Sequence, residues 1–218
     1  MPRRAILSIA AVVGALALIV AIALVVARPW ESRAPEPGAS VATEATIAES
    51  THLLSDAGEG SPVVVEFLDY ECPSCGQLHP VVHDLVDEYG DRVTFAVRHF
   101  PLPGHPSAIP AALAVEAAAQ QDAFERMHET VFERQREWSG ADDPAATLRG
   151  YAEELGLDMA AFDAAIADDA TMERVSFDAN AGMELGVRST PSFFVDGELL
   201  VLQRVDDLRA AVEAALAD

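Results

Sequence analysis

The sequence predicts an α/β fold in which a strand–helix–strand unit comes first, a long helical block follows, and a strand–strand–helix unit comes last. Three observations support this order. Residues 63–68 form a short apolar run rich in β-branched side chains, which is typical of a buried strand. Helix-forming residues dominate from about 107 to 186. Asp196-Gly197 separates two further apolar runs, and this dipeptide is a strong hairpin signal.

The first unit begins with the strand at 63–68, which the turn residues 60–62 precede. Residues 76–89 predict a helix, and the β-branched run at 93–97 predicts a second strand. Connections of this kind are right-handed and leave the two strands parallel. The sequence therefore predicts a parallel pair at the start of the sheet.

Helix boundaries and a change of period define the rest of the fold. Pro144, Asp158 and Thr171 are suitable helix starts, and Gly156 and Gly186 are suitable stops. The helices expected in the block span 108–121, 121–137, 144–155, 158–167 and 171–185, and the last unit consists of strands at 192–195 and 198–202 and a helix at 205–217.

The amino-terminal residues predict a membrane anchor. Residues 5–27 form an apolar run longer than the roughly 20 residues that cross a bilayer. Because Arg3 and Arg4 precede this run, the positive-inside rule places residues 1–4 in the cytoplasm and the rest of the chain outside. A cleaved signal peptide stays open as an alternative, since residues 25–27 resemble a cleavage site. Both interpretations export the chain.

A linker and one folded domain follow. Residues 28–50 are rich in proline, alanine and acidic side chains, which is typical of an extended tether. Residues 51–218 are enough for one domain with a buried core. We therefore expect a single-pass protein of the cell membrane with a cytoplasmic amino terminus and an extracytoplasmic domain.

The chain is strongly acidic, with a formal net charge of −22 that arises from 36 acidic and 14 basic side chains, all of the latter arginine. Such a surface excludes nucleic acid as a partner, because phosphates require cationic contacts. The exclusive use of arginine fits genome composition, and the acidity fits either genome composition or a saline habitat.

Cys72 and Cys75 are the only cysteines, and they lie at the junction of the first strand and its helix. A helix N-terminus offers free N–H groups and a partial positive charge, which favour a thiolate. We expect Cys72 to be exposed with a lowered pKa, and Cys75, one turn further, to be shielded. A pair this closely spaced restrains little of an unfolded chain, so it predicts a redox site rather than a structural disulfide.

A zinc site is a distant alternative. Cys72, Cys75, His79 and His83 fall within a narrow arc of a regular helix, and cysteine and histidine are usual zinc ligands. Pro80 distorts this helix, and zinc sites usually draw their ligands from two segments. We therefore expect no metal and no cofactor.

With the Cys-Pro-Ser-Cys motif at 72–75 and Thr190-Pro191 before the hairpin, the chain resembles the DsbA-like thiol:disulfide oxidoreductases in their membrane-anchored form. The resemblance covers about residues 61–218. It implies a thioredoxin-like fold with a helical insertion at about 107–186.

The resemblance also implies roles for single residues. Cys72 is the expected nucleophile and Cys75 the resolving cysteine. Pro191 matches the family's cis-proline, which faces the disulfide and binds extended substrate, and Thr190 is expected to contact the disulfide. An ordinary trans proline that opens a strand is the alternative for Pro191.

The active-site loop, Pro73 and Ser74, departs from the best-known oxidases, which carry histidine at the position of Ser74. The acidic Asp69 and Glu71 are also expected to disfavour a thiolate at Cys72. We therefore predict a weaker oxidant, with a reduction potential between about −120 mV for DsbA and about −270 mV for thioredoxin.

Glu66 interrupts the apolar strand, where DsbA-like relatives carry a buried acid. A buried carboxyl tends to be protonated, which makes Glu66 a candidate proton relay for Cys75. The alternative is a solvated acid on the outer face of the strand. Arg98 is a candidate for a cationic partner of Glu66.

The sequence thus predicts an extracytoplasmic oxidase that donates the Cys72–Cys75 disulfide to exported cysteine-containing proteins through a mixed disulfide. A DsbB-like or vitamin K epoxide reductase-like membrane protein is the expected redox partner. The alternative is a reductase or isomerase that uses the same site in reverse.

Overall fold

The computed structural model describes residues 46–217. The predicted span at 5–27, the segment 1–4 that precedes it, and most of the linker at 28–50 lie outside the described residues. Within 46–217, no helix is both long enough and apolar enough to cross a membrane.

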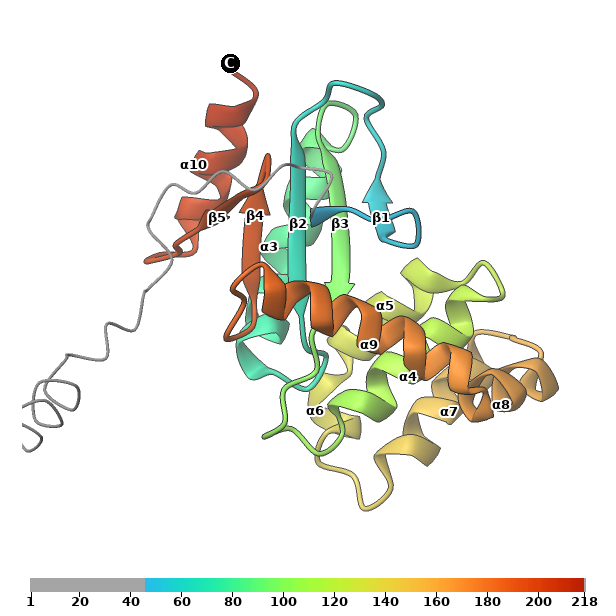
Figure 1. Cartoon of the computed structure of the whole chain (residues 1–218). Coiled ribbons are helices and arrows are strands. Elements are labelled where there is room, and N and C mark those ends of the chain that lie inside the picture. Colours follow the sequence, from blue (N-terminus) through green and yellow to red (C-terminus); the bar gives the residue numbers. More distant parts are fainter. Residues whose placement is uncertain (1–45, 218) are drawn as a thin grey trace, which may run out of the picture. The chain divides into compact units, whose positions relative to one another are not determined.

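The centre of the fold is a five-stranded sheet with the order β1-β3-β2-β4-β5 (Figure 1). As predicted, β2 and β3 are parallel; the other neighbouring pairs are antiparallel. The strands are β1 (His52–Ser55), β2 (Val63–Leu68), β3 (Thr94–His99), β4 (Ser192–Val195) and β5 (Glu198–Leu200).

Eight helices are present in the described part of the chain. The predicted helix at 121–137 is divided into two, and the others lie close to their predicted places. They are α3 (Pro73–Tyr89), α4 (Ala108–Ala119), α5 (Phe124–Glu133), α6 (Gln135–Trp138), α7 (Pro144–Glu154), α8 (Met159–Ala167), α9 (Asp169–Glu184) and α10 (Asp206–Ala215).

Helices cover both faces of the sheet, as the alternation of side chains along β2 requires. Val64 packs with the apolar faces of α3 and α10. Val65 and Phe67 point to the opposite face, where Ala179 of α9 packs near them. Strand β2 is therefore buried on both faces, which explains its nearly continuous apolar sequence.

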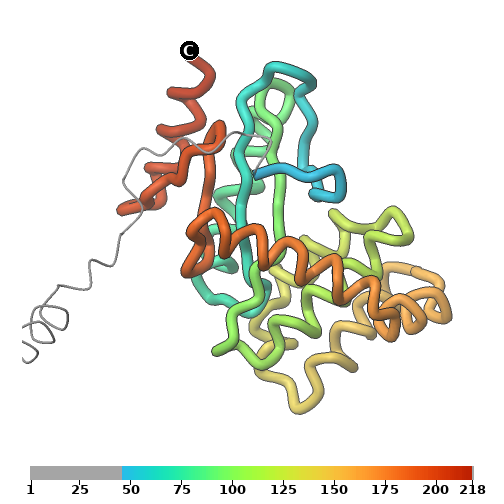
Figure 2. Tube along the Cα trace, viewed as in Figure 1, coloured from blue at the N-terminus to red at the C-terminus, as the bar shows by residue number. Residues whose placement is uncertain are grey.

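The helical insertion has its own core around the alanine-rich helix α4, whose small side chains allow the neighbouring helices to approach closely. Figure 2 shows α9 returning from the insertion across the sheet toward β4. The core of the insertion also contains Tyr70, Cys72 and Cys75, so the insertion packs directly against the cysteine motif.

Two features were not predicted. Strand β1 lacks an alternating pattern and pairs with β3 through an irregular register. Thr46, which the prediction placed in the linker, is buried, and Arg98 donates a hydrogen bond to its carbonyl oxygen. The folded part therefore begins before residue 51.

Candidate redox site

Both cysteines lie where β2 passes into α3. Cys72 directly precedes the helix, and Pro73 takes the first helical position, where a missing N–H costs nothing. Both cysteines are free thiols. Cys75 is fully buried, and only 6% of Cys72 is exposed. The expectation of an exposed Cys72 is thus wrong, because its sulfur lies against the carbonyl group of Thr190.

The two thiols differ sharply in acidity. A hydrogen bond from Cys75 lowers the pKa of Cys72 from 9.0 to about 5, against the effect of burial and with help from Thr190 and the backbone N–H groups of Ser74 and Cys75. Burial raises the pKa of Cys75 far above its ordinary value, and Cys72 and Glu66 raise it further. At neutral pH the pair therefore consists of one thiolate and one buried thiol.

The Thr190-Pro191 segment faces the cysteines, as the resemblance implied. The peptide bond is cis, so the alternative of a trans proline is wrong. In its protonated form the Cys72 thiol donates to the Thr190 carbonyl oxygen over 3.4 Å. Among the described residues the buried Thr190 hydroxyl has no partner apart from Cys72, whose pKa its hydrogen bond lowers. Because β4 follows Pro191 and pairs with β2, the sheet itself brings the two segments together.

Glu66 is buried in the middle of β2, between Val97 of β3 and Phe193 of β4. Burial, and to a lesser degree the negative charge of Cys72, raise its pKa from 4.5 to about 8. The alternative of a solvated acid is therefore wrong. Arg98 is not its partner, because the guanidinium pairs with Asp178 at 2.7 Å.

The substitution Glu66→Gln tests this burial through the pH dependence of stability. The folded chain keeps a proton on Glu66 up to about pH 8, whereas the unfolded chain releases it near pH 4.5. The stabilisation is therefore complete below pH 4.5 and is lost as the pH rises through 8. We expect the variant to match the parent at pH 4 and to exceed it by about 2–4 kcal/mol at pH 9 in urea unfolding.

The exposed Glu125→Gln is the matched control, and it should change the free energy of unfolding little at either pH. Equal stabilities of the Glu66→Gln variant and the parent at pH 9 would show that Glu66 carries no such penalty when it is charged.

The acidic residues before Cys72 are held by the loop that follows β3. Asp69 is buried, with His105 Nδ1 2.6 Å from its carboxylate, and Glu71 accepts the Ser107 N–H over 2.6 Å. The hydrogen bond to Asp69 raises the pKa of His105, so the two side chains offset each other's charge. The pKa of Cys72 is lowered beside these acids, whose carboxylates are engaged by His105 and by the Ser107 N–H.

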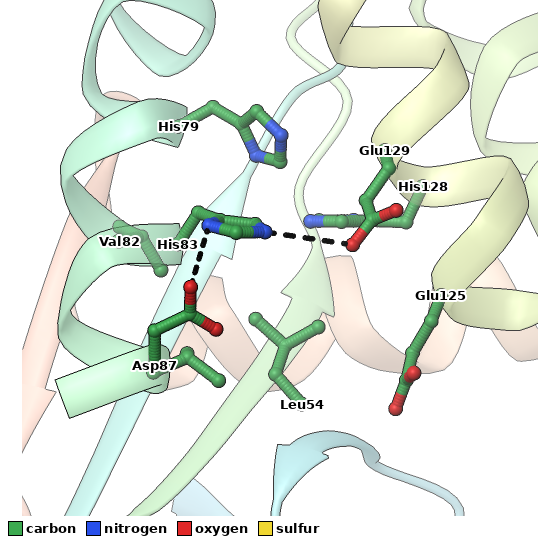
Figure 3. A pocket seen from close by; sticks show the side chains of 9 residues that line it. Leu54, His79, Val82, His83, Asp87, Glu125, His128 and Glu129 are labelled. Carbon is green, nitrogen blue, oxygen red and sulfur yellow. Dashed lines mark ion pairs between the residues drawn. The ribbon is translucent and has the colours of Figure 1, made fainter. Parts of the chain in front are cut away.

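The four residues of the zinc alternative, Cys72, Cys75, His79 and His83, form no convergent cluster among the described residues. Within 46–217, the group of cysteine, histidine and acidic side chains whose ligand atoms come together is a different one. His79 and His83 instead line a cavity of about 220 Å³ between α3 and α5 (Figure 3). His83 lies between Asp87 and Glu129, with N–O distances of 3.6 and 3.8 Å.

The convergent group consists of His52, His99 and Glu116. The Nε2 atoms of both histidines lie within hydrogen-bond distance of the same Glu116 oxygen, at 2.9 and 2.7 Å. Burial opposes a charge on Glu116, but these hydrogen bonds outweigh it and hold the pKa of Glu116 below its usual range. Arg174 lies 3.7 Å from the same oxygen. The two histidine Nε2 atoms thus share Glu116 as their partner, and a nearby guanidinium disfavours a metal cation.

Comparison with solved structures places this fold among bacterial oxidoreductases. The chain is 28% identical to a thioredoxin-like oxidoreductase from Silicibacter pomeroyi, with a TM-score of 0.65 over 78% of this chain and 95% of the other. It also matches oxidised BdbD from Bacillus subtilis, with 22% identity and a TM-score of 0.65 over 77% of this chain and 94% of the other. A variant of α-DsbA1 from Wolbachia pipientis, in which two cysteines are replaced by alanine, matches with 20% identity and a TM-score of 0.68 over 81% of this chain and 96% of the other. The last two identities support the fold alone.

The curated relatives are matched over only a small part of their length. The chain is 42% identical over 140 residues to the Na+/H+ antiporter NhaA 3 of Salinispora tropica, which is 64% of this chain and 21% of that protein. It is 38% identical over 161 residues to NhaA 1 of Salinispora arenicola, 73% of this chain and 24% of that protein. The match therefore spans about a fifth to a quarter of the antiporters.

The family comparison covers the domain that contains the cysteines. A family model described as Thioredoxin matches residues 57–214, from the loop before β2 into α10. This range includes the cysteine motif, the helical insertion and the cis-proline. The chain therefore belongs to this thioredoxin family, and its structural neighbours are DsbA-like oxidoreductases.

Proposed function

We propose that this chain is a thiol:disulfide oxidoreductase that works as an oxidase, donating the Cys72–Cys75 disulfide to cysteine-containing proteins. The observation that carries the proposal is the separation of the two pKa values, with Cys72 lowered to about 5 and Cys75 raised. A stabilised Cys72 thiolate is a good leaving group and favours the reduced form of the protein, which is the property of an oxidant.

The reaction begins with the two cysteines joined as a disulfide. A substrate thiolate attacks the sulfur of Cys72, the Cys72–Cys75 bond breaks, and Cys75 leaves and takes up a proton. Glu66, whose pKa is about 8, holds a proton at neutral pH and is the proposed donor. A second substrate thiolate then attacks the mixed disulfide at the substrate's own sulfur and releases Cys72 as a thiolate. Two electrons thus pass from the substrate to the protein.

Residues 5–27 are proposed to anchor the chain in the cell membrane, with residues 1–4 in the cytoplasm and the folded domain outside. The apolar length of this segment and the arginines before it support the proposal. Exported proteins with cysteines are then the proposed substrates. A membrane protein of the DsbB or vitamin K epoxide reductase type is proposed to accept the electrons and restore the disulfide.

A direct test mixes the oxidised full chain with an equimolar reduced peptide that contains two cysteines. We expect one peptide disulfide to form for each Cys72–Cys75 disulfide consumed, measured by alkylation and mass spectrometry. A peptide that stays reduced while the oxidised chain remains intact would contradict an oxidase. Rapid reduction of a disulfide-bonded peptide by the reduced chain would favour the opposite direction.

A further inference from the structure

Gln135, the first residue of α6, links the helical insertion to the cysteine motif. Its Nε2 donates two hydrogen bonds, one to the Tyr70 carbonyl oxygen over 2.7 Å and one to the Cys72 carbonyl oxygen over 2.9 Å. The Cys72 carbonyl also accepts the first helical hydrogen bond of α3, from the N–H of Gly76 over 3.1 Å. The side-chain amide of Gln135 thus restrains two peptide groups of the cysteine loop, the one that follows Tyr70 and the one that follows Cys72.

Gly76 provides the space for this contact. A Cβ atom at this position would lie 2.8 Å from Cδ of Gln135, closer than real Cβ atoms come to other atoms, and 3.0 Å from Nε2. Glycine within a helix costs about 1 kcal/mol relative to alanine. A glycine in the first turn of α3 has this cost, but it leaves the space in which the Gln135 side chain packs against the Gly76 backbone.

The orientation of the Cys72 peptide decides where its sulfur lies relative to the start of α3. The N–H groups of Ser74 and Cys75 act on the Cys72 sulfur from the first turn of the helix. Because these N–H groups belong to the helix, the backbone position of Cys72 helps to set the distance from its sulfur to them. The hydrogen bonds of Gln135 restrain that peptide from the side of the insertion.

We propose that Gln135 is a positioning residue, which holds the Cys72 peptide so that a thiolate at Cys72 faces the N–H groups at the start of α3. The inference rests on the proposed function, in which Cys72 acts as a thiolate. Through this contact the helical insertion contributes to the chemistry of the cysteine pair, even though Gln135 itself does not touch the reacting sulfur.

The test is the rate of alkylation of Cys72 against pH, in the reduced full chain. Gln135→Met keeps the length and volume of the side chain but removes both donors. We expect the pKa of Cys72 to rise by about 0.5 to 1, a three- to tenfold change in its acid constant, which matches the loss of ordinary hydrogen bonds. Gln135→Ala is measured in the same way and should also raise the pKa of Cys72. This second variant provides the test if Gln135→Met does not fold.

Gln121 offers a matched control. Its side chain also bonds to backbone groups, since Nε2 donates to the Asp158 carbonyl and Oε1 accepts the Asp158 N–H. Both Gln121 and Asp158 belong to the insertion. Gln121→Met should therefore lower stability by a similar amount and leave the pKa of Cys72 unchanged. An equal rise in the pKa of Cys72 in both methionine variants would overturn the proposal, because the effect would then be one of general stability.

The contact with Gly76 gives a second test. Gly76→Ala displaces the Gln135 side chain and should raise the pKa of Cys72 as Gln135→Ala does. Because both changes break one contact, the double variant should be no worse than either single one. Additive shifts, or an unchanged pKa of Cys72 in Gln135→Met, would overturn the proposal. A pKa of Cys72 near 9 in the parent chain would instead contradict the proposed function and its thiolate.

Discussion

Replacing Cys75 by alanine is expected to stop turnover and to leave the chain joined to its substrate. Without Cys75 the internal disulfide cannot form, so oxidation of a peptide should fall at least about a thousandfold. The Cys72 sulfur stays at the start of α3, where Thr190 and the backbone N–H groups of residues 74 and 75 still favour a thiolate after the hydrogen bond from Cys75 is lost, so it should still attack a disulfide-bonded peptide. Since no second thiol resolves the product, a mixed disulfide should accumulate, and mass spectrometry of the alkylated full chain measures it.

The matched variant Cys72→Ala separates the roles of the two cysteines. Cys75 is fully buried and its pKa is raised, so this variant should form almost no mixed disulfide at neutral pH. Equal yields of mixed disulfide from both variants would contradict the assignment of Cys72 as the nucleophile.

The second large effect is expected at Asp178, a fully buried carboxylate of α9. It pairs with Arg98 at 2.7 Å and with Arg174 at 2.7 Å, and it accepts the backbone N–H of His99. Asp178→Ala leaves buried guanidinium charge without its partner. Removing one member of a buried ion pair costs about 3–5 kcal/mol, and we expect a loss of this size in the free energy of unfolding, measured in urea.

A pair on the surface provides the control. Asp163 binds Arg149 in a bidentate arrangement, with both side chains about half exposed. Such pairs contribute about 0–1 kcal/mol, so Asp163→Ala should have a small effect. If Asp178→Ala cost no more than Asp163→Ala, the buried network would not hold α9 to β3.

The elements around the cysteines could be predicted because their signals are local. A β-branched run, a proline at the first helical position and an Asp-Gly turn each lie within a few residues of the structure that they specify. Strand β1 could not be predicted in this way, because its place depends on pairing with β3, about 40 residues further along the chain. The same limit applies to the boundary at Thr46, which depends on a contact with Arg98.

The candidate site shows the same division. Cys72, Cys75 and Pro191 belong to motifs, and the structure brings the Thr190-Pro191 segment against the cysteines, as the resemblance implied. His105 and Gln135 belong to no motif, and 36 and 63 residues separate them from their partners Asp69 and Cys72. The burial of Cys72 was missed for the same reason, because Thr190 covers its sulfur from a distant part of the chain.

The reduction potential of the Cys72–Cys75 pair tests the proposed oxidase most directly. The full chain is equilibrated in glutathione buffers of known potential, and the reduced fraction is measured by alkylation. The sequence predicts a reduction potential between about −120 and −270 mV. The lowered pKa of Cys72 narrows this prediction to values above about −200 mV, those of a disulfide donor. A value near −270 mV would contradict the oxidase and indicate a reductant, and a pair that does not titrate would contradict the redox function itself.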